Sequence, residues 1–250
     1  MSNNLKILSD LSKLKEKDSI YIALRKKEGR VYSDEIVKVL PDIEEKHPLS
    51  YEWKIRKASF EKLKEYLSNK NQSLEVLDLG CGNGWLGNAL AQINDFKVTC
   101  VDINLAELEQ GARVFGRNKN IKFIFGDIFE TTFGLHFYDI IIIAAAVQYH
   151  PSVEKLISRL LRLLKPGGEI HIMDSPIYKM NTVAAAKKRS ENYYKQLGFE
   201  EMKSNYYHHS WNDFENLSYS VMNRSLKDLF RLNFFKTKHL LFPWIVITQP

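Results

Sequence analysis

Short apolar runs and amphipathic stretches alternate through the middle of the chain. The apolar runs predict strands, and they lie at 74–79, 97–103, 121–126, 138–144 and 169–173. Stretches with apolar residues three or four positions apart predict helices, at 85–93, 105–116 and 152–164. Because strands alternate with helical crossovers, this part of the chain predicts a parallel, doubly wound α/β sheet.

The two flanks of this region have a different pattern. The first 70 residues predict helices, with the clearest amphipathic stretch at 55–67. After Ser175 the pattern loosens into a predicted helix at 183–197 and a polar, aromatic stretch, and an apolar run at 244–248 predicts a last strand. We therefore expect an N-terminal helical extension or lid at 1–70. The domain at 71–250 would then carry a lid-like insertion at about 176–240.

The composition narrows the class of protein. A chain of 250 residues that is 44% hydrophobic can bury a sizeable core. Its two cysteines, Cys81 and Cys100, cannot make a disulfide framework or a Cys-based zinc site, so we expect a reducing compartment and no metal. No apolar stretch reaches the roughly 20 residues of a membrane helix, and charges interrupt the N-terminus where a signal peptide has its apolar core. The sequence predicts a cytoplasmic protein without a membrane partner.

The net charge of +6 is spread over the two flanks. Residues 1–73 carry a net +4 and residues 179–250 a net +5, whereas residues 74–178 carry a net −3. Nucleic-acid binding needs a basic patch with interleaved aromatics or a recognisable module, and the sequence shows neither. We interpret the basic flanks as solvated helix faces and expect no specific nucleic-acid partner.

One segment carries the clearest chemical signal. The first central strand ends in Asp78-Leu-Gly-Cys-Gly-Asn-Gly84, and a predicted helix follows. Glycines let a backbone turn sharply and approach a ligand closely. The next two strands end in Asp102 and Asp127, and in a parallel sheet such strand ends meet at one edge, where ligands bind. A carboxylate at Asp102 can accept both hydroxyls of a ribose and one at Asp127 the amine of an adenine, so the set predicts a nucleoside site.

The same loop also matches the dinucleotide-binding fingerprint, as Gly82-x-Gly84-x-x-Gly87 with an acid about 20 positions on. Two features argue against a nicotinamide cofactor. Asp78, just before the glycines, would repel a pyrophosphate but attract a cationic amino group. The fingerprint also needs its first glycine directly after an apolar strand, whereas this strand ends in an acid and an earlier glycine. A methionine-type group fits the loop better than a pyrophosphate.

At this point the sequence resembles the class I S-adenosylmethionine-dependent methyltransferases, in their small-molecule branch. The resemblance rests on five segments in that family's order and spacing, at 78–84, 101–103, 126–128, 138–150 and 163–168. It extends over about residues 74–175 and hardly touches the flanks. It implies a Rossmann-like, doubly wound sheet of seven strands in which the last strand, at 244–248, inserts antiparallel. It also implies S-adenosyl-L-methionine as the cofactor and S-adenosyl-L-homocysteine as its product.

Carried over position by position, the resemblance implies a complete cofactor site. The implied contacts are with the methionine amino group (Asp78, Gly80, Cys81, Gly82, Gly84), the ribose (Asp102), the adenine (Ile103, Asp127, Ile128), the sulfonium end (Ala144, Val147, Gln148) and the methionine carboxylate (Arg56).

The acceptor side is less defined, and the sequence assigns no catalytic residue. A general base is needed only if the acceptor is protonated. Candidates follow the last two parallel strands, and an aromatic stretch downstream either lines an acceptor pocket or forms an ordinary aromatic edge. These residues are His150, Asp174 and Tyr178, and then Tyr206, Tyr207, His208, His209 and Trp211.

The leading hypothesis is a methyltransferase, a monomer or homodimer, acting on a small or medium-sized acceptor. A nucleic-acid methyltransferase is one alternative, but the segment after the fourth strand lacks the Asn/Asp-Pro-Pro-aromatic signature of methylation on base amines. A protein methyltransferase is a second alternative. A non-catalytic protein that only binds S-adenosylmethionine is the third.

Overall fold

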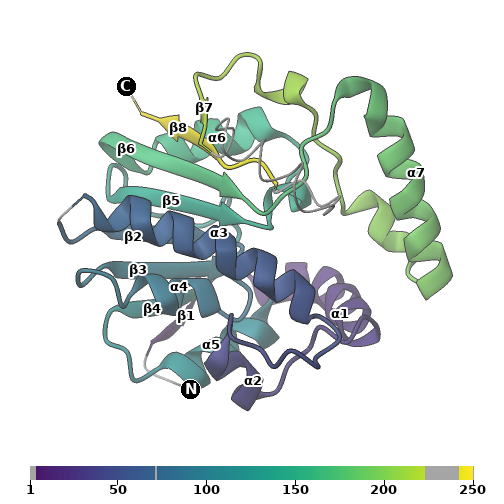
Figure 1. Cartoon of the computed structure of the whole chain (residues 1–250), viewed down its shortest axis with the longest axis horizontal. Coiled ribbons are helices and arrows are strands. Elements are labelled where there is room, and N and C mark those ends of the chain that lie inside the picture. The colour runs from purple at the N-terminus through teal and green to yellow at the C-terminus, as the bar shows by residue number, and fades with distance from the viewer. Residues whose placement is uncertain (1–3, 71, 223–241, 250) are drawn as a thin grey trace.

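The computed structural model describes residues 4–70, 72–222 and 242–249, and its centre is one sheet with helices on both faces (Figure 1). The five predicted central strands are β2 (Glu75–Leu79), β3 (Lys97–Asp102), β4 (Ile121–Phe125), β5 (Tyr138–Ala144) and β6 (Leu164–Met173). They lie in the order β4-β3-β2-β5-β6, and every neighbouring pair is parallel. The predicted doubly wound α/β fold is confirmed.

Three further strands extend the sheet at its edges. The C-terminal strand β8 (Ile245–Thr248) runs antiparallel between β6 and the short β7 (Ser220–Val221), as predicted. On the other edge, β1 (Leu5–Ile7) pairs parallel with β4, with Leu5 opposite Phe123. Among the described residues, the sheet therefore has eight strands instead of the expected seven. Strand β1 could not be predicted from the sequence, because its three residues are too few to show the alternation of apolar and polar positions typical of a strand.

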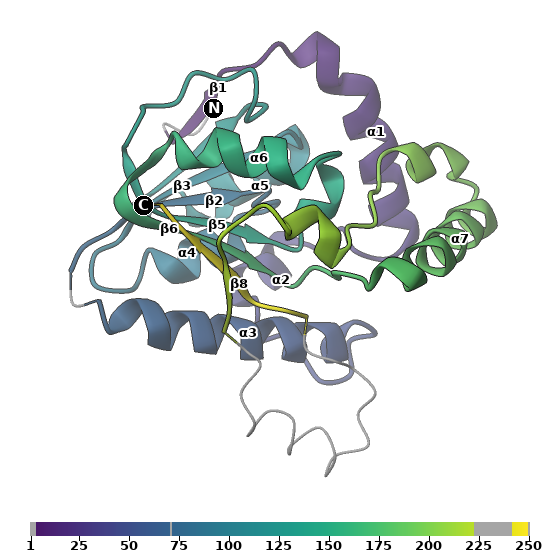
Figure 2. The same ribbon diagram turned by 90° about the horizontal axis from the view of Figure 1, so that it is seen from above.

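Helices cover both faces of the sheet (Figure 2). On one face lie α3 (Ser50–Ser68), α4 (Trp85–Leu90) and α5 (Leu105–Phe115), and on the other lies α6 (Val153–Leu161). The four isoleucines of β5 alternate between the two cores. Ile140 and Ile142 pack in the first core, and Ile141 and Ile143 in the second. This is the period of two that a strand covered on both faces requires.

Two of the helices beside the sheet, α5 and α6, begin at side-chain caps. Asn104, a residue type favoured at N-caps, opens α5 by accepting a hydrogen bond from the Glu107 amide at 3.1 Å. Ser152 opens α6 in the same way. Because α5 follows directly on β3, its cap also fixes where the end of β3 lies relative to the helix.

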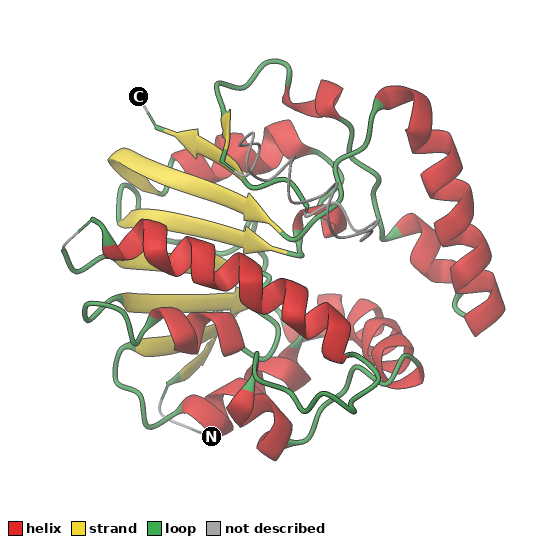
Figure 3. Ribbon diagram, in the orientation of Figure 1, coloured by secondary structure: helices red, strands yellow, loops and turns green. Residues whose placement is uncertain are grey.

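The flanks form a third, smaller cluster. Two helices pack together beyond the carboxyl ends of the strands, α1 (Leu11–Lys27) and α7 (Met180–Leu197), with the 3₁₀ segment η2 (Glu200–Ser204) against them (Figure 3). Their contact buries Leu24, Tyr194 and Met202. The predicted helix at 183–197 is therefore present as part of α7. Of the expected insertion at about 176–240, residues 223–241 lie outside the described residues.

The remaining elements are short. They are α2 (Asp34–Val39) and the 3₁₀ segments η1 (Val147–Tyr149) and η3 (Trp211–Phe214). Within the described ranges, no helix combines the length and the apolar character that crossing a membrane requires.

Candidate functional site

A cavity of about 990 Å³ lies at the carboxyl ends of the central strands. Its floor consists of the glycine loop and the strand ends, at residues 78–83, 102–103, 126–128 and 144–146. Its roof consists of cavity-lining side chains from α1, α7 and residues 202–207. Helix α3 closes one side with Trp53 and Arg56. The volume lies at the upper end of the roughly 300–1,000 Å³ usual for small-molecule sites.

The glycine loop takes a backbone path that side chains would block. Gly80, Gly82 and Gly84 have φ values of 74°, 54° and 74°, in the left-handed region that favours glycine. A Cβ on Gly80 would stand 2.4 Å from the Cβ of Ala146, and one on Gly84 would stand 2.4 Å from the ring of Phe123. The loop is thus pressed against the segment that follows β5, which puts its backbone on the cavity floor.

Asp78 is a buried carboxyl beneath this loop. Its side chain is 1% exposed, and its Oδ2 has no hydrogen-bond partner in the described part of the chain. Burial, and secondarily the charge of Asp102, raise the pKa of Asp78 to about 7. A buried carboxylate without a partner is costly, so this atom would be stabilised by a cationic group in the cavity.

Asp102 at the end of β3 holds the loop in place. Its Oδ2 accepts a hydrogen bond from the Gly82 amide at 2.8 Å, and its Oδ1 accepts one from the Asn104 amide at 2.9 Å. Burial raises the pKa of Asp102, while these amides oppose the rise. Each carboxylate oxygen has two lone pairs, so Asp102 can support the loop and still accept ligand hydroxyls.

Asp127 at the end of β4 also faces the cavity. Its Oδ1 accepts a hydrogen bond from the Phe129 amide at 2.8 Å, and its own amide donates to the Ser9 hydroxyl. The N-terminal segment therefore helps to fix this strand end, a contact that the sequence analysis did not predict.

Besides Gln148, ten of the predicted cofactor residues line the cavity, and the structure brings these ten together from five segments of the chain. They are Arg56, Asp78, Gly80, Cys81, Gly82, Asp102, Ile103, Asp127, Ile128 and Ala144.

Two predicted residues do not line the cavity. Val147 is fully buried and packs in the core beneath α6, because the turn into η1 points its side chain away from the cavity. Gly84 lies behind the loop against Phe123. Gln148 does line the cavity, and its amide group is held by the Ala145 carbonyl at 2.6 Å.

The acceptor candidates separate into two groups. His150, Asp174, Tyr206 and Tyr207 line the cavity. The other candidates lie outside its lining: Tyr178, His208, His209 and Trp211. His209 instead contacts the Val147 carbonyl at 3.1 Å through Nε2, and Trp211 stacks on Tyr219.

The two titratable candidates in the cavity have shifted pKa values. Burial lowers the pKa of His150 to about 4, so its imidazole is neutral at pH 7. Burial raises the pKa of Asp174, although a 2.6 Å hydrogen bond from the Ser59 hydroxyl opposes the rise. His150 is therefore unprotonated but a weaker base than an ordinary imidazole, whereas Asp174 is a stronger base than an ordinary carboxylate.

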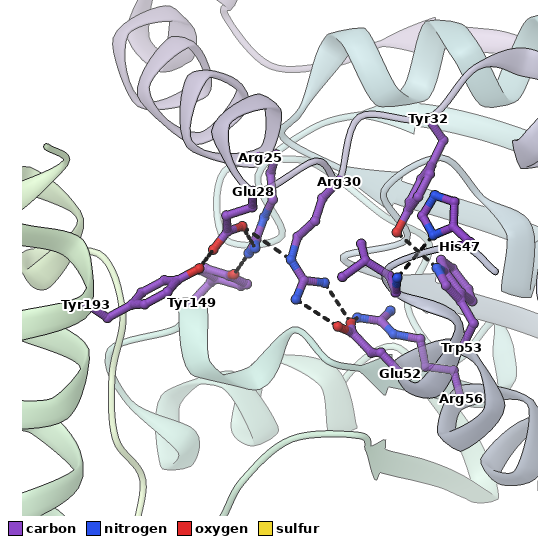
Figure 4. Close-up of polar contacts among 11 residues, drawn as sticks. Arg25, Glu28, Arg30, Tyr32, His47, Glu52, Trp53, Arg56, Tyr149 and Tyr193 are labelled. Carbon is purple, nitrogen blue, oxygen red and sulfur yellow. Dashed lines mark hydrogen bonds and ion pairs between the residues drawn. The ribbon is translucent and has the colours of Figure 1, made fainter. Parts of the chain in front are cut away.

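A charged belt of five residues runs along the cavity wall (Figure 4). It consists of Arg25, Glu28, Arg30, Glu52 and Arg56. Glu52 contacts Arg30 at 2.7 Å and Arg56 at 2.9 Å. Burial alone would raise the pKa of Glu52, but hydrogen bonds and charge from the two arginines outweigh it and lower the pKa to about 2.

The belt joins three helices. At its other end, Glu28 contacts Arg25 at 2.6 Å and accepts a hydrogen bond from the Tyr193 hydroxyl of α7 at 2.5 Å. Arg25 also donates to the Tyr149 hydroxyl in η1. From the sequence, the basic flanks were interpreted as solvated helix faces, and for Arg25 in the N-terminal flank that interpretation is wrong, because Arg25 lines the cavity.

The roof residues were the main omission of the sequence analysis. Tyr21, Arg25, Tyr149 and Tyr194 all line the cavity. The four-residue spacing of Tyr21 and Arg25 on a helix is a signal that they share a face. Nothing in the sequence indicates that this face meets α7.

Comparison with known proteins agrees with this geometry. Residues 76–168, which hold most of the floor, match the family described as a methyltransferase domain. A sterol 24-C-methyltransferase of Candida albicans is 26% identical over 103 residues, 40% of this chain and 27% of that protein. A ubiquinone biosynthesis O-methyltransferase of Rickettsia conorii is 30% identical over 112 residues, 44% of this chain and 37% of that protein.

Solved structures share the fold. Geranyl diphosphate C-methyltransferase from Streptomyces coelicolor A3(2) has a TM-score of 0.55 and 15% identity, over 83% of each chain. Residues 76–168 of this chain thus match a methyltransferase-domain family, which agrees with the resemblance seen in the sequence. The matched segments span only 27% and 37% of the length of these two curated relatives.

Proposed function

We propose that this protein transfers the methyl group of S-adenosylmethionine to a small or medium-sized acceptor held in the cavity. The observation that carries the proposal is the coincidence of the matched segment with the cavity floor. The glycine loop and the three acidic strand ends of residues 76–168 all face one open cavity of about 990 Å³. That volume leaves space for an acceptor beside a nucleoside-sized cofactor.

The residues of the floor suit this cofactor. S-adenosylmethionine supplies an already activated methyl group when bound. The buried Asp78 Oδ2, which has no partner in the described part of the chain, fits a cationic amino group above it. We propose that Asp78, Gly80, Cys81 and Gly82 contact the methionine amino group of the cofactor and that Arg56 contacts its carboxylate. Asp102 would contact the ribose, and Ile103, Asp127 and Ile128 the adenine. Ala144 would lie at the sulfonium end.

The roof would exclude water from the cavity and orient the acceptor. Transfer from a sulfonium depends mainly on aligning the acceptor, the methyl group and the sulfur, and on excluding water. Helices α1 and α7 meet over the cavity and bury Leu24, Tyr194 and Met202 between them. We propose that they form a composite lid, in which the N-terminal segment and the segment after β6 close the site together.

A proton acceptor is available if the acceptor needs one. His150 is neutral at pH 7, because burial holds its pKa near 4, and it lines the cavity just past η1. Asp174 lies beyond the end of β6. We propose both as candidates for a general base: His150 is unprotonated at pH 7 but weakly basic, and the raised pKa of Asp174 makes it a stronger base than an ordinary carboxylate.

The test is transfer of an isotope-labelled methyl group from S-adenosylmethionine into a cell extract separated into small molecules, protein and RNA. Sterols and ubiquinone precursors come first among pure acceptors, because the relatives' names mention them. We expect label in a small molecule. Label in the protein or RNA fraction would contradict the small acceptor, and tight cofactor binding without any transfer would indicate a binding protein.

A further inference from the structure

The roof of the cavity has a chemical character of its own. The residues that α1, α7 and positions 202–207 contribute to the lining are Tyr21, Arg25, Ser190, Tyr193, Tyr194, Met202, Asn205, Tyr206 and Tyr207. Met202 is the sole aliphatic side chain among them. A site for a long aliphatic acceptor would need apolar walls, so the roof favours a polar, planar molecule.

The tyrosine rings pack edge to face. Tyr149 contacts Tyr21 with ring centroids 5.8 Å apart, and it contacts Tyr206 at the same distance. Tyr206 in turn contacts Tyr194 at 6.1 Å. These contacts hold the rings in fixed orientations although they come from α1, η1, α7 and the segment after η2.

The hydroxyls of this wall are hydrogen-bond donors. Burial raises the pKa of Tyr21, Tyr194 and Tyr206, so all three stay neutral phenols at pH 7. The Tyr149 hydroxyl accepts a hydrogen bond from Arg25, which leaves its own proton to donate. A hydroxyl polarised by a guanidinium in this way is a stronger donor than an isolated one.

Arg25 adds charge to these donors. Its guanidinium lies 4.7 Å over the Tyr21 ring and contacts Glu28 and Tyr149. A guanidinium has five N–H donors, and hydrogen bonds to Glu28, Tyr149 and Tyr21 take three of them, which leaves two. The charge of Glu28 is shared between two arginines, because this carboxylate also contacts Arg30 at 3.4 Å. Along the whole belt, three arginines share two glutamates, which leaves one positive charge in excess (Figure 4).

We propose that Arg25 and Tyr149 bind an anionic oxygen group of the methyl acceptor, a carboxylate or a phosphate, with the body of the acceptor against the tyrosine wall. This inference rests on the proposed function, because it assigns a chemical class to the acceptor. A guanidinium and a phenol are suited to both anions. Tyr149 lies three residues after the floor segment 144–146, so an anion bound there places the rest of the acceptor beside the sulfonium end of the cofactor.

The test measures binding of four probes to the protein saturated with S-adenosylhomocysteine. The probes are 4-hydroxybenzoate and phenyl phosphate, as the two anions, and 4-hydroxybenzamide and phenol, as their neutral counterparts. We expect both anions, or one of them, to bind about tenfold or more tightly than the neutral counterpart. The anion that binds more tightly identifies carboxylate or phosphate. Equal binding of anions and neutral probes, or no anion binding at about 10 mM, would overturn the proposal.

Variants connect the preference to these residues. Arg25→Gln should abolish the preference for the anion, Arg25→Lys should restore part of it, and Tyr149→Phe should weaken it by about threefold to tenfold. Two matched controls should keep it. Arg113→Gln removes an arginine paired with Asp34 outside the cavity, and Tyr66→Phe removes a hydroxyl bonded to Glu169 at 3.0 Å. A preference that survives in Arg25→Gln would contradict the assignment.

The readouts separate this proposal from the one on which it rests. Binding of S-adenosylhomocysteine is measured first in every variant, and it also reports whether the variant folds. If the wild-type protein does not bind S-adenosylhomocysteine, the proposed function fails. If it binds the nucleoside normally but does not distinguish anions from neutral probes, only the acceptor assignment fails.

Discussion

The floor and the roof of the cavity are built by different means. The floor is mostly backbone, and its shape follows from glycines with positive φ and from short acidic side chains that hold loop amides. The roof is made of long side chains, tyrosines and one arginine. They belong to helices that pack against each other although they lie far apart in the sequence. A floor of this kind tolerates little change, whereas a roof of this kind can be altered one side chain at a time. The comparison suggests that the floor holds the cofactor and the roof selects the acceptor.

The largest effect is expected at Gly80, in the floor. Gly80→Ala forces a residue with a Cβ into φ 74° and places that Cβ 2.4 Å from the Cβ of Ala146. Backbone strain and overpacking each cost about 1–3 kcal/mol, so we expect a loss of about 2–4 kcal/mol in stability, cofactor affinity or both. Denaturant unfolding and calorimetry measure the two quantities.

A matched control isolates the clash. Gly167 has φ 75°, but a Cβ there would meet no atom within 4 Å. Gly167→Ala should therefore show the backbone strain alone and leave cofactor affinity unchanged. If the two variants lose the same cofactor affinity, close packing of the floor is not what shapes the site.

The second prediction concerns Asp102. Asp102→Ala leaves the amides of Gly82 and Asn104 without their acceptor and removes the proposed ribose contact. Hydrogen bonds to charged groups contribute about 1.5–3 kcal/mol, so cofactor affinity should fall by about 2–3 kcal/mol. Asp102→Asn keeps one acceptor oxygen and should lose less. Unchanged affinity in a folded Asp102→Ala variant would remove Asp102 from the site.

The third prediction is a pH dependence at Asp78. The pKa of this carboxyl is about 7 in the folded protein, above its ordinary 3.8, so the fold favours the protonated form. Its contribution to stability is complete below pH 3.8 and is lost as the pH rises through about 7. Asp78→Asn resembles the protonated form. At pH 8 it should raise the free energy of unfolding of the cofactor-free protein by roughly 1–3 kcal/mol.

The same Asp78→Asn variant should bind the cofactor with lower affinity. If Asp78 meets a cationic amino group, Asp78→Asn gains stability but loses cofactor affinity, and the wild-type protein releases a proton on binding near pH 7. Calorimetry in two buffers with different ionisation enthalpies detects that proton. A variant with gained stability and unchanged cofactor affinity would make Asp78 a structural residue only.

The smallest effect is expected in the roof. Tyr193→Phe removes the 2.5 Å hydrogen bond to Glu28 that links α7 to α1. Because Tyr193 is 44% exposed, we expect a cost of about 1 kcal/mol or less. Hydrogen exchange of the α7 amides should become faster, with little change in cofactor affinity. A large loss of cofactor affinity would show that the roof and floor are not independent.

The floor could be predicted from the sequence because its geometry is local. The loop from Asp78 to Gly84 is one continuous segment, and Asp102 and Asp127 stand where strands end, so topology alone brings them together. Asn104 was identifiable as a helix cap for the same reason. Val147 shows the limit of this reasoning, since an apolar residue after a strand can face the cavity or the core, and here it faces the core.

The roof and the edge of the sheet could not be predicted in this way. Strand β1 has three residues, and its pairing with β4 depends on a partner far along the chain. The meeting of Arg25 with Tyr149, and of Tyr21 with the wall around Tyr206, depends on how α1 and α7 pack. No periodicity within a single segment encodes such a contact, because it is a property of two helices together.

The central claim is that the floor binds S-adenosylmethionine, and one calorimetric comparison tests it most directly. The full chain is titrated with S-adenosylmethionine, S-adenosylhomocysteine, NAD and NADP under the same conditions. We predict micromolar binding of the first two and no measurable heat from the dinucleotides, because Asp78 lies buried below the loop where a pyrophosphate would sit. Binding of NAD that is tighter than binding of S-adenosylmethionine would contradict the account.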